Sequence, residues 1–185
     1  TAVGASALLT NTAGVYNTAV GNNALKMTNG DGTTGSFNAA FGSNALSSNT
    51  TGAKNSAFGH QAIKTNTTGS NNIGFGFSSL YNVTTASDNV ALGTYAGINI
   101  STGAKNIFIG SNAGEKYSTG STNNNTTGLN SVLIGYDVRP LANGDNNEIV
   151  LSGYNGTAGT VGLGSNTTLI GNSLITKAQI YGALT

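Results

Sequence analysis

Short apolar segments recur along the chain, each ending in a glycine and each followed by a polar stretch. In the example Asn55-Ser-Ala-Phe-Gly59-His-Gln-Ala-Ile63, an apolar strand-like segment precedes the glycine and an Ala-Ile pair follows it. The equivalent glycines are mostly 17 residues apart: Gly4, Gly21, Gly42, Gly59, Gly76, Gly93, Gly110 and Gly135. Polar turns such as Thr67-Thr-Gly69 separate the units. This self-similarity indicates a repeat architecture.

Each unit is expected to contain two short strands. The first ends at Val20, Phe41, Phe58, Phe75, Leu92 or Ile109. The second is expected around Ala24-Leu25, Ala45-Leu46 and Ala62-Ile63. A 17-residue unit is shorter than the roughly 30 residues that a strand, helix and strand crossover needs. We therefore predict an all-β parallel β-solenoid, a β-roll of 17-residue coils in which equivalent residues stack.

Stacking would align two kinds of residue in columns. The glycines would form a column where a residue without Cβ permits left-handed dihedrals or a tight bend. An asparagine column is expected to form an amide ladder that satisfies backbone groups in the turns. Its members are Asn17, Asn38, Asn55, Asn72, Asn89 and Asn106.

Two spacings between glycines are longer and predict loop insertions. Gly21 and Gly42 are 21 residues apart, and Gly110 and Gly135 are 25 apart. The insertions are placed near residues 26–32 and 115–125. The repeat array is predicted to span residues 1–153, and residues 154–185, where the period breaks down, are expected to form irregular capping strands.

Three later strands are apolar at consecutive positions: Ile107-Phe-Ile109, Val132-Leu-Ile134 and Ile149-Val-Leu151. Successive residues of a strand point to opposite faces, so both faces of these strands need cover. One thin coil covers one face. We expect neighbouring chains to cover the other, in a homotrimer around the rod axis.

The composition excludes several classes of function. Only 7% of the 185 residues are charged, the formal net charge is +1, and there is no cysteine. Balanced charge offers no electrostatic attraction to nucleic acid, and no apolar run approaches the ~20 residues of a membrane span. We therefore predict no nucleic-acid partner and no membrane insertion.

Residues for catalysis or metal binding are sparse. His60 is the single histidine and is interpreted as a surface residue of a coil. Glu115 and Glu148 are the only glutamates, and the aspartates fall mostly at turns, where Asp favours the local backbone. We predict that the protein is not an enzyme and has no cofactor and no metal site.

Asn130-Ser-Val-Leu-Ile-Gly135 closely resembles the strand signature of trimeric autotransporter adhesin heads, and Asp88 to Gly93 and Lys105 to Gly110 also fit it. The Asn-x-Ala-apolar-Gly strand with its Asn-Thr-Thr-Gly turn also looks like repeat arrays of bacteriophage tail fibres. The resemblance implies a left-handed β-roll and an extracellular location on a virion tail or a bacterial cell surface. The adhesin heads use a shorter coil.

These observations predict a non-enzymatic extracellular fibre segment, from a phage tail fibre or a trimeric adhesin, that attaches to a glycan or protein receptor on a cell surface. A purely structural self-assembling filament and an ice-binding protein are the alternatives. Receptor contacts are expected at the insertions and at exposed aromatic residues. The candidate residues are Met27, Asn29, Asp31, Glu115, Lys116, Tyr117 and Tyr136.

Overall fold

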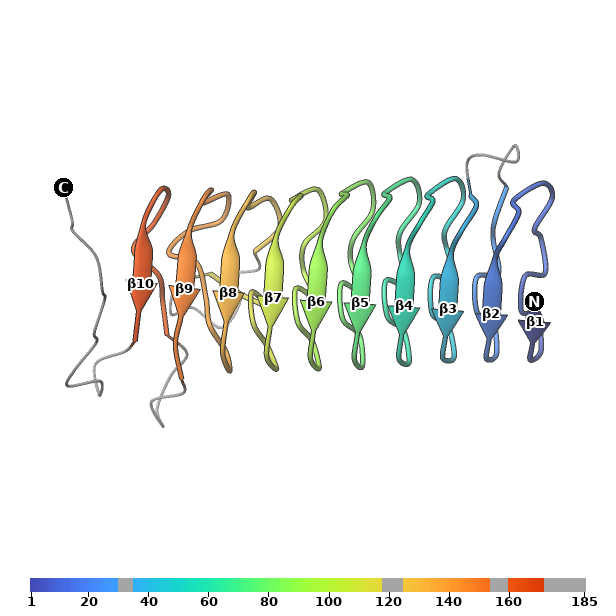
Figure 1. Ribbon diagram of the computed structural model, residues 1–185, viewed down its shortest axis with the longest axis horizontal. Helices are drawn as coiled ribbons and strands as arrows, with labels where there is room; N and C mark the ends of the chain where they lie inside the picture. Colours follow the sequence, from blue (N-terminus) through green and yellow to red (C-terminus); the bar gives the residue numbers. More distant parts are fainter. Residues whose placement is uncertain (30–34, 118–124, 154–159, 172–185) are drawn as a thin grey trace.

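The computed structural model describes residues 1–29, 35–117, 125–153 and 160–171. Ten short strands lie side by side in one parallel sheet, in chain order along a rod (Figure 1). They are β1 (Ala2–Val3), β2 (Thr18–Val20), β3 (Ala39–Phe41), β4 (Ser56–Phe58), β5 (Ile73–Phe75), β6 (Val90–Leu92), β7 (Ile107–Ile109), β8 (Val132–Ile134), β9 (Ile149–Leu151) and β10 (Thr168–Ile170). The described residues contain no helix. The predicted all-β parallel β-solenoid is confirmed, and the handedness of the coil and the trimer stay predictions.

Equivalent residues pair in register from coil to coil. Phe41 lies opposite Phe58, and Phe58 opposite Phe75. In β2 to β9 the central residue of each strand is buried inside its coil, whereas the first and third residues point outward. Because side chains alternate along a strand, three residues suffice to supply one core position and two surface positions.

The predicted second strand of each unit is wrong. The segments around Leu25, Leu46 and Ile63 are turns, and these three residues have φ of 47°, 50° and 50°. A strand needs negative φ, so residues in the left-handed region cannot continue one. The turn still joins the coils, because the backbone N–H of Leu25 donates to the carbonyl of Ala45 at 2.9 Å.

The glycine column lies where the chain leaves strands β1 to β8 and β10, and Ser152 takes the same place after β9. Gly21 has φ of 132°, a conformation that side chains rarely adopt. A Cβ placed on Gly21 would lie 2.6 Å from the carbonyl carbon of Gly42 in the next coil. Glycine is therefore needed for both the dihedral angle and the close approach of successive coils.

The asparagine column forms the predicted amide ladder. Oδ1 of Asn38 accepts a hydrogen bond from the backbone N–H of Asn55 at 2.9 Å, and Nδ2 of Asn38 donates to the carbonyl of Gly52 at 2.9 Å. The other asparagines of the column repeat the pattern and are Asn17, Asn55, Asn72, Asn89 and Asn106. Each buried side chain thus joins one coil to the next and closes a turn.

The polar turns between units form a second ladder. The hydroxyl of Thr50 donates to the carbonyl of Thr67 at 2.8 Å, and the hydroxyl of Thr67 donates to the carbonyl of Thr84 at 3.0 Å. The recurring threonines therefore satisfy backbone carbonyls at the bends.

A narrow core runs along the inside of the rod. Small central strand residues such as Ala40 and Ala57 pack with the fully buried Leu46 and Ile63 from the turns. Further along, Gly97 and Gly114 take the positions equivalent to Leu80, and Phe108 replaces the small residue at the strand centre. The bulk of the core therefore moves from the turn to the strand.

The sheet continues beyond Gly153. β10 lies within the range predicted to form capping strands, and it pairs in parallel with β9. Residues 154–159 and 172–185 of that range lie outside the described residues.

Candidate functional site

The candidate receptor-binding residues fall on separate coils. Met27, 43% exposed, and the exposed Asn29 follow β2, and the backbone N–H of Asn29 donates to the carbonyl of Thr50 at 2.8 Å. Asp31 and most of the second insertion lie outside the described residues. Glu115, Lys116 and Tyr117 follow β7, so five strands along the rod separate the two groups. The structure does not gather these residues into one site.

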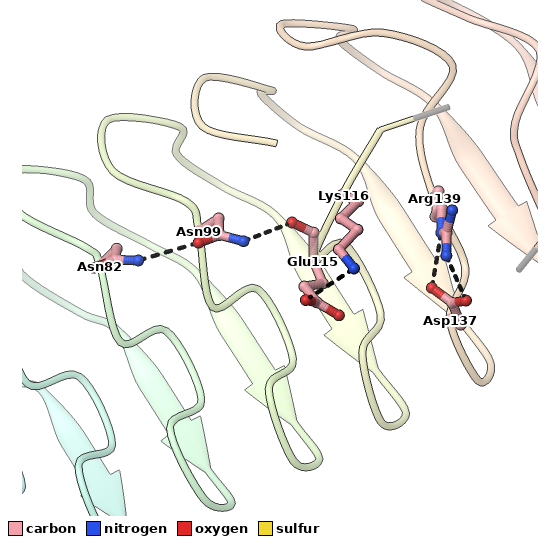
Figure 2. A network of polar contacts seen from close by, with 6 residues as sticks. All are labelled: Asn82, Asn99, Glu115, Lys116, Asp137 and Arg139. Carbon is pink, nitrogen blue, oxygen red and sulfur yellow. Dashed lines mark hydrogen bonds and ion pairs between the residues drawn. The ribbon is translucent and has the colours of Figure 1, made fainter. Parts of the chain in front are cut away.

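Glu115 and Lys116 lie where a line of polar side chains meets the second insertion (Figure 2). Nδ2 of Asn82 donates to Oδ1 of Asn99 at 3.1 Å, and Nδ2 of Asn99 donates to the carbonyl of Glu115 at 2.9 Å. Nζ of Lys116 lies 3.5 Å from Oε1 of Glu115. Both charged side chains are half-buried, and Tyr117 beside them is half-buried as well. The amide line therefore orients the backbone from which this charged pair extends.

An ion pair that the sequence analysis missed lies in the next coil (Figure 2). Nε of Arg139 donates to Oδ1 of Asp137 at 2.8 Å, and Nη2 donates to Oδ2 at 2.7 Å. This bidentate bond raises the pKa of Arg139 above its ordinary value, burial opposes the rise, and the charges of Asp137 and Glu115 add to it. The Asp-x-Arg spacing carries no recognisable signal in the sequence, because Arg139 stands in a column that earlier coils fill with aliphatic residues such as Leu80 or with glycine.

Tyr136 belongs to the turn after β8 and is 47% exposed. Its column contains His60 and Phe77, whose rings stack with centroids 5.2 Å apart. The ring of Phe77 also makes an edge contact with Tyr95 at 5.4 Å. His60 therefore lies within a surface row of aromatic rings, as expected for a coil residue.

Glu148 occupies the asparagine column at β9 and is fully buried. Its Oε1 accepts a hydrogen bond from the backbone N–H of Gly164 at 2.8 Å. Burial raises the pKa of Glu148 above its ordinary value, the Gly164 hydrogen bond opposes the rise, and the charge of Asp145 adds to it. Within the described ranges, no three His, Cys, Asp or Glu side chains gather where they could hold a metal ion.

Among the described residues, a further surface feature is the outward side of the sheet, here called the outer face. It consists of the first and third residues of strands β2 to β9, all of them partly or fully exposed: Thr18, Val20, Ala39, Phe41, Ser56, Phe58, Ile73, Phe75, Val90, Leu92, Ile107, Ile109, Val132, Ile134, Ile149 and Leu151. None of them is charged. The phenylalanines form a stack, with centroids 4.8 Å apart for Phe41 and Phe58 and 5.7 Å apart for Phe58 and Phe75.

The outer face is large enough to act as an interaction surface. With strands about 4.8 Å apart and residues about 3.3 Å apart, it is a strip of roughly 35 Å by 10 Å. Exposed apolar patches of a few hundred Å² often mark contact sites. A depression of about 180 Å³ is lined by Ala104, Lys105, Leu129 and Asn130.

In the part of the chain that the structure describes, no helix is long and apolar enough to cross a membrane. Comparisons with protein-family models, curated proteins and solved structures found no match.

Proposed function

We propose that this chain is a non-enzymatic extracellular fibre segment, of the kind found in a phage tail fibre or a trimeric adhesin, that attaches to a cell surface. In this proposal three copies assemble into the fibre, and a glycan or protein receptor is bound from its surface. The observation that carries the proposal is a rod of repeated coils with an uncovered apolar outer face, because such a rod suits lateral assembly better than catalysis in a pocket.

The rigidity of the rod supports this proposal. Successive coils are joined by parallel strand pairs, by the asparagine ladder and by the threonine hydroxyls. A rigid scaffold presents surface residues at constant spacing, and repeating weak contacts on several chains raises the overall affinity through effective concentration. Attachment then needs no deep binding site.

The receptor contacts are proposed at the residues beside the insertions and at the exposed Tyr136. Lys116 and Tyr117 flank the second insertion, and Met27 and Asn29 flank the first. The half-buried position of Lys116 against Glu115 limits the freedom of its side chain, which reduces the entropy lost on binding.

The test is binding of the labelled, purified chain to a panel of bacterial cells and to a glycan array. We expect binding to at least one surface, and we expect the double variant Lys116→Ala, Tyr117→Ala to weaken it by about tenfold or more. Lys54→Ala is the matched control, because Lys54 is an exposed lysine of a regular coil. Binding to no surface, or equal loss in the control, would contradict the proposal.

The structural filament is the main alternative, and the same ladders favour it because they could extend from one molecule to the next. Electron microscopy separates the two proposals, since a filament polymer grows with concentration in the absence of a receptor. Ice binding is less favoured, because an ice-binding face needs threonine side chains arrayed toward water. The hydroxyls of Thr50 and Thr67 instead donate to backbone carbonyls at the bends. Measurement of thermal hysteresis tests it.

A further inference from the structure

A third ladder runs along the rod, at the position that precedes each strand by three residues. The backbone N–H of Ala53 donates to the hydroxyl of Ser70 in the next coil at 3.0 Å, and the N–H of Ser70 donates to the hydroxyl of Ser87 at 3.0 Å. Closer to β10, the N–H of Asn146 donates to the hydroxyl of Ser165 at 3.0 Å. A side-chain oxygen of one coil thus satisfies a backbone donor of the coil before it.

This ladder is interrupted at Ala104 and Leu129, whose side chains carry no oxygen. Among the residues that the structure describes, the backbone N–H groups of Ser87 and Ala104 have no acceptor. The repeat directs the N–H of Ala104 toward position 129, because the equivalent N–H of Ala53 donates to the side chain of Ser70. An unpaired backbone donor in a half-buried place is costly, and an oxygen atom of a ligand would satisfy it.

Two coils of the same chain show what the interruption changes. Residues 53–55 and residues 104–106 are both Ala-Lys-Asn, and the next coil places an asparagine level with each lysine. The residue before that asparagine differs, because the first copy has Ser70-Asn71 and the second has Leu129-Asn130. The depression of about 180 Å³ lies at the second copy. The exchange of a serine for a leucine therefore leaves a backbone donor uncovered beside a hollow.

Three hydrogen-bond donors border this depression. They are the backbone N–H of Ala104, Nζ of Lys105 and Nδ2 of Asn130. Within the described ranges, Lys105 makes no ion pair and the side chain of Asn130 makes no hydrogen bond. The nearest carboxylate of the lysine column is that of Asp88, one coil earlier, and it accepts a hydrogen bond from Nδ2 of Asn71 at 3.0 Å. Three donors with one positive charge favour a ligand that brings negatively charged oxygens.

We propose that this depression binds the carboxylate group of a small ligand, with the carbon atoms of the ligand against Leu129. One ammonium group balances one carboxylate, whereas the second charge of a phosphate or sulfate would be unbalanced and would lie near Asp88. The volume of about 180 Å³ is smaller than the roughly 300–1,000 Å³ of common ligand pockets, so the site takes a short molecule. Leu129 is 38% exposed and supplies an apolar wall. The site does not depend on the receptor contacts proposed above.

The test is ligand-observed NMR with butanoate as the probe and butanamide, its uncharged counterpart, as the control ligand. We expect butanoate to bind the natural chain with a Kd on the order of millimolar, and butanamide to bind about tenfold more weakly or less. Lys105→Met should weaken butanoate binding by about tenfold or more, because it removes the charge and keeps much of the side-chain length. Lys54→Met is the matched control and should leave binding unchanged, since Lys54 follows Ala53, whose N–H is already bound by Ser70.

Leu129→Ser tests the role of the interrupted ladder. The new hydroxyl should accept the N–H of Ala104, as Ser70 accepts that of Ala53, and butanoate binding should fall by about tenfold or more. Leu129→Asn replaces this variant should circular dichroism show that it is unfolded, because Asn146 already fills the same column with a side-chain oxygen.

Three results would overturn the carboxylate site. They are absence of butanoate binding to the natural chain, equal binding of butanoate and butanamide, and unchanged binding in Lys105→Met. Unchanged binding in a folded Leu129→Ser variant would overturn the role of the unpaired N–H of Ala104. Inorganic phosphate that displaces butanoate at an equal or lower concentration would overturn the preference for a carboxylate.

Discussion

The ring of Phe108 fills the space beside Gly97, where an added Cβ would lie 2.7 Å from Cδ2 of the phenylalanine. Earlier coils divide the same volume differently, with Leu80 in the turn and a small residue such as Gly74 at the strand centre. A large side chain in the turn is thus replaced by a large side chain at the strand centre, and both fill the same part of the core. The core stays filled although its largest side chain changes column.

We expect Gly97→Ala to destabilise the fold by about 1–3 kcal/mol, because the methyl group would press against Phe108 and the left-handed φ of 58° disfavours alanine. Thermal and denaturant unfolding followed by circular dichroism measures the change. Gly153→Ala is the control, since a Cβ at Gly153 would meet no atom of the described residues within 4 Å. Equal stability of the two variants would mean that Phe108 does not constrain position 97.

Asn55→Ala tests the amide ladder. The substitution removes the acceptor of the backbone N–H of Asn72, which Oδ1 of Asn55 binds at 2.9 Å in the buried interior. A buried donor left without a partner costs about 1–3 kcal/mol, so we expect a loss of stability of that size in denaturant unfolding. Asn22→Ala, at an exposed position outside the ladder, should change stability by less than about 0.5 kcal/mol. A harmless Asn55→Ala would show that the ladder contributes little.

Glu148 should make the stability of the coil depend on pH. Its pKa is raised in the folded chain, mainly by burial, so the folded state favours the protonated carboxyl. The stabilising contribution is complete below the unfolded pKa, near the ordinary value of 4.5, and is lost as pH rises through the raised folded pKa.

Glu148→Gln should remove this dependence and raise the melting temperature at neutral pH, because the neutral amide avoids burying a charge. Melting curves of both proteins between acidic and neutral pH check the prediction. Glu115→Gln, at a half-buried surface position, is the control and should keep the pH dependence of the natural chain. A melting temperature of Glu148→Gln that falls below that of the natural chain at neutral pH would contradict the expected sign.

Asp137→Asn tests the bidentate ion pair. Asparagine tolerates the φ of 51° at this position, so the substitution removes the charge with little backbone strain. Because the pair with Arg139 is mostly buried, with 14% of each side chain exposed, we expect a loss of about 1–3 kcal/mol. Breaking the longer Glu115–Lys116 pair by Lys116→Ala should cost less than about 1 kcal/mol. Urea unfolding compares the two, and similar losses would show that burial does not strengthen the Arg139 pair.

Much of the candidate surface could be predicted from the sequence, but its grouping could not. The insertions and the exposed residues Met27 and Asn29 follow from interruptions of the period, and the exposed Tyr136 follows from its aromatic side chain in the column after the glycine. The pairing of Asp137 with Arg139 does not, because Arg139 stands in a column that carries aliphatic residues or glycine in earlier coils. The buried Glu148 likewise takes an asparagine position, and the hydrogen bond from the backbone N–H of Gly164 that helps to hold its carboxylate has no signal in the sequence.

The repeat period by itself determined the parallel stacking, the glycine column and the asparagine ladder, because in-register stacking brings every equivalent residue into one column. The tertiary structure decided what lies between those columns. The segments around Leu25 and Leu46 are apolar enough to suggest strands, yet they turn, because a closed coil needs bends on both sides of a three-residue strand. It also decided that Phe108 packs inward while Ile107 and Ile109 point outward. An apolar triplet is the same in sequence whichever face it buries, and only the packed coil gives each side chain its direction.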